Sequence, residues 1–156
     1  MINLIALTLL LFFVSLNLGG GLYEWRAVYP NWKKNVSPET LVRQLQTSGQ
    51  WLANNRFWPL VSPAQGLLAI VNIVLAMRCD GNAHPYWVAA ACIVLAGRII
   101  TFAIFIPPML RIFMKPGGTD KKRLQEQVTQ WTGLSAWRLP LEGLGWVLAL
   151  WAFHLL

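Results

Sequence analysis

Charged residues are scarce in this sequence, and acidic residues are the scarcest. Only 12% of the 156 residues are charged, and 6 Asp and Glu residues stand against 13 Lys and Arg residues, which gives a formal charge of +7. Soluble domains carry about a quarter charged residues. This shortage excludes an ordinary water-facing surface over most of the chain.

Residues of common catalytic and metal sites are scarce as well. The chain has 2 cysteines and 2 histidines. Cys79 and Cys92 form no CxxC pair, so they predict neither a disulfide nor a cysteine-based metal site. His84 and His154 lack the spacing of metal ligands. The sequence shows no Ser/His/Asp arrangement, phosphate-binding glycine loop or dinucleotide fingerprint, and we expect no metal and no cofactor.

Apolar residues, by contrast, are abundant: 56% of the chain is hydrophobic, and 9 residues are tryptophan. Four apolar stretches are long enough to cross a hydrocarbon core, which takes about 20 residues. They are residues 2–26, 57–78, 86–112 and 135–156. The first is longer than the apolar part of a signal peptide and lacks a basic start, so we expect a retained helix. The sequence thus predicts one all-α transmembrane domain over residues 1–156, an integral membrane four-helix antiparallel bundle.

The basic residues gather in two of the three connections between these stretches. Lys34 and Arg43 lie in the first connection, and Lys121 and Arg123 lie in the third. Because cytoplasmic loops are rich in Lys and Arg, we expect both basic loops in the cytoplasm and both termini outside a bacterial inner (plasma) membrane. The charge therefore indicates a multi-pass topology and does not indicate nucleic-acid binding.

Two short helices are expected at the cytoplasmic interface, one in each basic loop. In the first loop, Ser37 followed by Pro38 and Glu39 is typical of a helix start. In the third connection, Thr119 is the expected N-cap and Asp120 falls in the first turn.

Each apolar stretch carries small and polar residues on one helical face. In chain order these faces contain Asn17, Gly20, Gly21 and Glu24; Ser62, Gln65 and Asn72; Arg98 and Thr101; and Arg138, Glu142 and Gly145. Lipid disfavours such residues, so the faces are predicted to point into the bundle. The simpler interpretation of Gln65 and Asn72 is hydrogen bonding between helices; the alternative is a ligand-lined pocket.

Arg98 is the strongest single signal. A lone cation near the middle of a membrane costs at least about 2.5 kcal/mol, so it requires an anion or water. We predict that Arg98 pairs with Glu142 or with Glu24, and that Arg138 completes the network. A purely structural ion pair is one alternative. In another alternative, Arg138 pairs with Glu142 within one helix, so that Glu24 is the remaining partner for Arg98.

Three sequence segments resemble a known family. They are "GGGLYE" (Gly19, Gly20, Gly21, Tyr23 and Glu24), "TFAIFIPPMLRI" (Thr101 and Pro107) and "VTQWTGLSAWR" (Trp131 and Arg138). Together they resemble the small four-helix membrane proteins grouped with fungal anthrone oxygenases. We expect the three glycines to bring the first helix close to a neighbour and so to place Glu24 near the arginines.

The resemblance implies oxidation of a phenolic polycycle by O2 without metal or flavin. Such chemistry needs a base and an apolar pocket that excludes water. Glu24 or Glu142 is the implied base, and Arg98 would hold the substrate oxygen. Tyr23 and Trp131 would stack on the rings.

Two functions stay open at this point. The first is a membrane protein whose polar pocket binds a small hydrophobic, quinone-like or phenolic molecule, with or without catalysis. The alternative is a non-catalytic accessory subunit that packs against another membrane protein or a second copy. A cavity enclosed by one chain favours the first function, whereas an Arg98 or Asn72 on the outer surface favours the second.

The predicted orientation is testable by cysteine labelling. Cysteines introduced at Lys34 and Lys121 are expected to react only with a reagent that reaches the cytoplasm, because both positions lie in basic loops. Labelling of either position from the periplasmic side would overturn the orientation.

Overall fold

The computed structural model describes residues 1–34, 37–47, 49–114 and 120–156, and within these ranges the chain is helical and contains no strand. The expectation of an all-α chain is confirmed. The elements are α1 Ile2–Tyr23, η1 Glu24–Val28, α2 Tyr29–Trp32, α3 Pro38–Thr47, α4 Gln50–Arg56, α5 Trp58–Ala76, α6 His84–Ile100, η2 Thr101–Phe105, α7 Ile106–Met114, α8 Lys121–Ala136 and α9 Arg138–Leu155, where η1 and η2 are π-helices.

The predicted helix starts have different outcomes. Ser37 caps α3, since its Oγ accepts a hydrogen bond from the backbone N–H of Thr40 at 3.2 Å. Thr119, the expected N-cap of the second interfacial helix, lies outside the described residues. The helix α8 begins at Lys121, and Asp120 is its N-cap rather than a first-turn residue.

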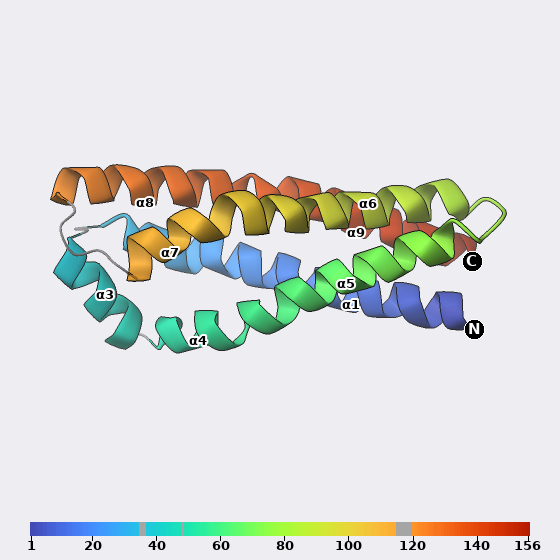
Figure 1. Ribbon diagram of the computed structural model, residues 1–156, viewed down its shortest axis with the longest axis horizontal. Helices are drawn as coiled ribbons and strands as arrows, with labels where there is room; N and C mark the ends of the chain where they lie inside the picture. Colours follow the sequence, from blue (N-terminus) through green and yellow to red (C-terminus); the bar gives the residue numbers. More distant parts are fainter. Residues whose placement is uncertain (35–36, 48, 115–119) are drawn as a thin grey trace.

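The successive long helices α1, α5, α6 and α9 run in opposite directions along the molecule (Figure 1). Helix α6 packs against α5 and α9, and α1 packs against the same two helices, so α1, α5, α6 and α9 form a closed ring of contacts. Both termini and the α5–α6 turn lie at one end of the molecule, and α3, α4, α7 and α8 lie at the other (Figure 1).

Three helical segments among the described residues are long and apolar enough to cross a membrane: Ile2–Trp32, Trp58–Ala76 and His84–Arg111. Helix α9 is not among these segments, because Arg138, Glu142 and His154 lower its mean hydropathy. The fourth predicted span, residues 135–156, therefore stays a prediction.

The outward faces of all four helices are nevertheless apolar. Large exposed hydrophobic side chains include Phe12 of α1, Leu67 of α5, Ile99 of α6 and Val147 of α9. Soluble monomers rarely expose apolar surface on this scale. The surface of α9 is thus like that of the three more apolar segments.

Two separate hydrophobic cores occupy the two ends of the molecule. The terminal core, at the end with both termini, includes Leu7, Leu10, Val14, Ala69, Trp87, Ala91, Val94 and Ala149. The cap core, at the opposite end, consists of Val28, Tyr29, Trp32, Leu41, Leu45, Phe105, Leu124, Val128 and Trp131. On α6 and η2, Arg98 and Thr101 fall between Val94 of the first core and Phe105 of the second, so a polar layer separates the cores.

The glycines of "GGGLYE" differ in their surroundings. A Cβ on Gly20 would lie 3.1 Å from the rings of Phe57 and Trp58, and one on Gly21 would lie 2.8 Å from Leu139 Cδ2. A Cβ on Gly19 would meet no atom of the described residues within 4 Å. Close approach of α1 to its neighbours therefore depends on Gly20 and Gly21.

Replacing Gly20 with alanine tests this packing. Both Gly20→Ala and Gly19→Ala gain the higher helix propensity of alanine, about 1 kcal/mol. Only Gly20→Ala crowds Phe57 and Trp58, and overpacking costs about 1–3 kcal/mol. We expect the melting temperature in detergent to be a few degrees lower for Gly20→Ala than for Gly19→Ala. Equal melting temperatures would contradict the close-packing role.

Candidate functional site

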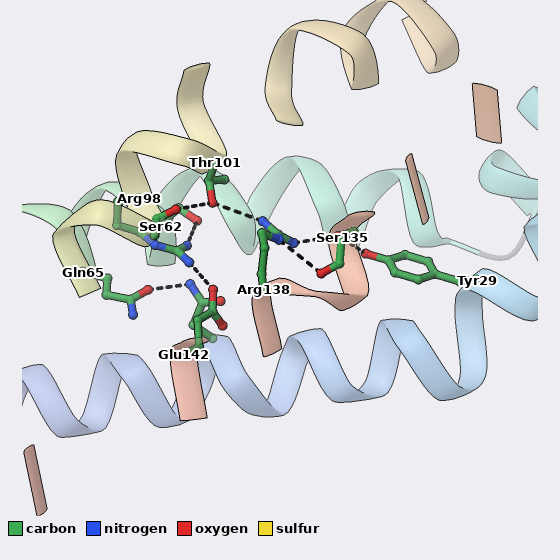
Figure 2. A network of polar contacts seen from close by, with 10 residues as sticks. Tyr29, Ser62, Gln65, Arg98, Thr101, Ser135, Arg138 and Glu142 are labelled. Atoms are coloured by element: carbon green, nitrogen blue, oxygen red, sulfur yellow. Dashed lines mark hydrogen bonds and ion pairs between the residues drawn. The ribbon is translucent and has the colours of Figure 1, made fainter. Parts of the chain in front are cut away.

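A buried ion pair lies at the centre of the polar layer. Arg98 Nη2 on α6 pairs with Glu142 Oε1 on α9, and the two side chains are only 2% and 6% exposed. Arg98 Nη1 donates a hydrogen bond to Ser62 Oγ on α5 at 3.0 Å, and Figure 2 shows the guanidinium between these two partners. The predicted pair of Arg98 with Glu142 is thus confirmed, and the alternative that joined Arg98 to Glu24 is wrong.

The Asn17 amide joins α1 to this pair. In one orientation its Nδ2 donates to Gln65 Oε1. In the other orientation Nδ2 donates to Glu142 Oε2 at 3.0 Å and Oδ1 accepts from Arg98 Nη1. The second orientation suits both charged neighbours, because the carboxylate receives a donor and the guanidinium an acceptor. All four long helices therefore contribute a side chain to the layer.

Two buried donors of the polar layer, Arg98 Nε and Gln65 Nε2, have no hydrogen-bond partner among the described residues. A buried donor without a partner costs about 1–3 kcal/mol. Such a group in a folded protein calls for an explanation, and a functional role is one of them.

A second polar cluster lies next to the ion pair, on the side of the cap core. The Glu24 carboxylate accepts hydrogen bonds from Trp58 Nε1 at 2.7 Å and from the Tyr29 hydroxyl at 3.0 Å. The Tyr29 hydroxyl also lies 2.9 Å from Ser135 Oγ, which accepts a hydrogen bond from Arg138 Nη2 at 2.8 Å. Figure 2 shows the hydrogen bonds that link Tyr29 through Ser135 to Arg138. A carboxylate and a guanidinium are thus joined through two hydroxyls.

Thr101 also holds Arg138 in place. Arg138 Nη1 donates to Thr101 Oγ1 at 3.2 Å, and the guanidinium carbon lies 4.7 Å from the centre of the Phe105 ring. Both contacts come from η2, and Glu24 opens the other π-helix, η1. Such π-segments within helices are frequent at functional sites.

A cavity of about 340 Å³ opens beside this second cluster. Its volume is at the lower end of the range for small-molecule sites, about 300–1,000 Å³. Its wall consists of Glu24, Asn55, Trp58, Pro59, Ser62, Pro63, Thr101, Phe102, Phe105, Ile106, Met109, Leu110, Trp131 and Arg138. An anionic and a cationic side chain therefore border one mostly apolar and aromatic space.

The predicted site residues divide into three groups. Glu24, Thr101, Trp131 and Arg138 line the cavity. Asn17, Gln65, Arg98 and Glu142 form the buried layer beside it. Asn72 and Tyr23 lie elsewhere, since Asn72 is in the terminal core and the Tyr23 side chain is 64% exposed.

Asn72 connects helices rather than lining the cavity. It is 0% exposed, its Nδ2 donates to Ala6 O at 3.1 Å, and its Oδ1 accepts from Trp87 Nε1 at 2.8 Å. These bonds join α5 to α1 and α6. Hydrogen bonding between helices, the simpler interpretation of Asn72, is what its contacts support.

Several residues of the site were not predicted. They are Tyr29, Trp58 and Ser135. Tyr29 lies five residues after Glu24, a spacing that joins side chains on one face only where the helix is of the π type. The sequence carries no pattern that marks η1 or η2.

Metal-ligand residues do not cluster in the part of the chain that the structure describes: no three His, Cys, Asp or Glu side chains lie together there. The polar side chains that border the cavity instead include a carboxylate, a guanidinium, two hydroxyls and the Asn55 amide. A carboxylate can accept a proton from a bound phenol, and a guanidinium can bind the resulting oxygen anion.

Removing one member of the buried ion pair is expected to destabilise the protein. Arg98→Leu leaves Glu142 buried without its cation, a change that costs about 3–5 kcal/mol. Adding Glu142→Leu removes the unpaired charge, so the double variant should recover part of the lost melting temperature in detergent. An unchanged melting temperature for Arg98→Leu would contradict the role of the pair.

Comparisons with known proteins identify no relative of this chain. Protein-family models, curated proteins and solved structures were all compared with it, and none matches. The resemblance to the anthrone oxygenase group therefore stays a prediction, and the function must be inferred from the cavity and its side chains.

Proposed function

We propose that α1, α5, α6 and α9 cross a bilayer as an antiparallel four-helix bundle. The three long apolar segments support this arrangement, and so does the exposed apolar surface of α9. Arg138 and Glu142, two of the three residues that lower the hydropathy of α9, bond to side chains of the polar layer and need not face lipid. The third, His154, lies near the end of the helix. In this arrangement the basic loops and the cap core lie in the cytoplasm or at its interface, and both termini lie outside.

Within this bundle, the cavity is the proposed binding site for a small hydrophobic molecule of the phenolic or quinone-like class. The observation that carries this function is that Glu24 and Arg138 border one cavity together with the rings of Trp58, Phe105 and Trp131. Aromatic walls suit a planar ring, and the two charged groups suit a ring that carries an ionisable oxygen.

Cofactor-independent oxidation is the reaction proposed for this site. Glu24 is the base, because it borders the cavity, whereas Glu142 is paired with Arg98. For the same reason Arg138, and not Arg98, holds the substrate oxygen. For an anthrone the balanced reaction consumes O2: the ring CH2 becomes a second carbonyl, and water is released.

The accessory-subunit alternative has less support. It would be favoured by Arg98 or Asn72 on the outer surface, where a partner would have to cover them. Arg98 is only 2% exposed and Asn72 is fully buried within the single chain. Their polar groups thus give no reason to invoke a covering partner.

Binding of 1,8-dihydroxyanthrone to the purified protein tests the site. Calorimetry in lipid nanodiscs without oxygen gives the Kd. Arg138→Gln should raise the Kd about tenfold or more, because a hydrogen bond from a charged group contributes about 1.5–3 kcal/mol. Glu24→Gln should change the Kd less, but should abolish anthraquinone formation when oxygen is admitted.

The matched controls lie at the opposite end of the molecule. Arg78→Gln and Asp80→Asn remove one charge of each sign from the α5–α6 connection, far from the cavity, and should leave binding and turnover unchanged. Variants are compared only if their helical circular dichroism matches the unaltered protein. A Kd that is the same for Arg138→Gln and the unaltered protein would exclude this cavity as the site.

A further inference from the structure

An apolar groove runs along the outer face of α5 and α6, directly beside the cavity. Its walls are Pro63, Gly66, Leu67 and Ile70 of α5, and Leu95, Arg98, Ile99, Phe102 and Ala103 of α6 and η2. On each helix these positions recur at helical spacing, so the groove follows the two helix axes. Arg98 presents its aliphatic stem there, since its Cβ and Cγ face Gly66 and its guanidinium is held in the polar layer.

The groove and the cavity meet at two shared residues, Pro63 and Phe102. Both helices are irregular at this junction. Pro63 lies inside α5 and has no N–H to donate to the preceding turn. Phe102 lies in η2, where the helix is widened to the π form. The two hollows therefore lie next to each other, with charged side chains at the cavity end and apolar side chains at the groove end.

We propose that the ligand of this site is an amphiphile, with its ring in the cavity and a single apolar tail in the α5–α6 groove. This inference rests on the proposed function and specifies its ligand class. A tail-free phenol would leave the groove to bilayer lipid, whereas a tailed phenol or quinol fills both hollows with one molecule.

The dimensions and direction of the groove fit such a tail. From Pro63 to Ile70 the groove extends about 10 Å along α5, at 1.5 Å per residue. It leads from the cavity toward the end that holds the terminal core, which is toward the middle of the bilayer in the proposed orientation. A ring near the cytoplasmic interface with its tail pointing inward has the orientation of a lipid in the cytoplasmic leaflet.

A second hollow of about 500 Å³ also borders the cavity, through Phe105 and Trp131, but it suits a tail less well. It lies between α7 and α8, and Arg111, Gln127 and Gln130 form part of its wall. Placing an alkyl chain there would desolvate these polar groups, which costs free energy. The side chains that line the groove are apolar except for Arg98, whose aliphatic stem faces it.

Photoaffinity labelling distinguishes these locations. The main probe is 4-octylphenol with a diazirine at the end of the octyl tail, and a companion probe carries the diazirine next to the ring. Both are applied to the full-length protein in lipid nanodiscs, and labelled residues are identified by mass spectrometry. We expect the tail probe to label residues 66–70 and 95–99 about tenfold more than the outward residues of α9, and excess 4-methylphenol to compete.

Two glycine variants provide a matched pair. Gly66→Phe adds bulk to the groove, and its Cβ would lie 3.6 Å from Arg98 Cγ, an ordinary van der Waals contact. Gly143→Phe adds the same bulk to α9, at a position where a Cβ would have no neighbour within 4 Å among the described residues. Tail labelling should fall to the α9 level in Gly66→Phe and stay unchanged in Gly143→Phe.

The outcomes separate this inference from the proposed function. Any of three results with the tail probe would overturn the tail site. They are equal labelling of α5, α6 and α9, labelling of α7 and α8, and labelling that does not change in Gly66→Phe. If the companion probe then still labels cavity residues, and does so less in Arg138→Gln, the binding function stands without a tail. If excess 4-methylphenol reduces the labelling by neither probe, both proposals fail for this ligand class.

Discussion

The fold depends on satisfying one guanidinium inside an apolar helix assembly. Arg98 cannot reach water from its position on α6, so it needs an anion and further hydrogen-bond acceptors nearby. Glu142 supplies the anion, Ser62 accepts a hydrogen bond, and Asn17 links the pair to α1. Because each long helix provides one of these groups, the pair sets how far each helix can slide or rotate against the others.

The polar layer also explains where a cavity can form. The terminal core on one side and the cap core on the other are closely packed hydrophobic clusters. Between them, charged side chains and two π-helices interrupt regular helix packing. The cavity opens at this interruption, beside Glu24 and Arg138. Two charged residues that are costly to bury therefore border the cavity.

The sequence predicted which helical faces turn inward, because small and polar residues recur at helical spacing on one side of each apolar segment. It could not predict how the charged residues divide. Arg98 and Arg138 both lie on inward faces, yet Arg98 pairs with Glu142, whereas Arg138 borders the cavity. Tyr29 was missed because in a regular α-helix a residue five positions after Glu24 points about 140° away, whereas η1 brings it onto the same face.

By itself, the sequence determined the all-helical class, the apolar segments and the set of polar residues that share one face of each segment. These follow from composition and helical period, which are local properties. The tertiary structure alone decided which carboxylate meets which guanidinium, that Gly20 and not Gly19 is a point of contact, and that a cavity joins an apolar groove at Pro63 and Phe102. Those outcomes depend on distances between helices, and no local pattern along one helix encodes the position of its neighbour.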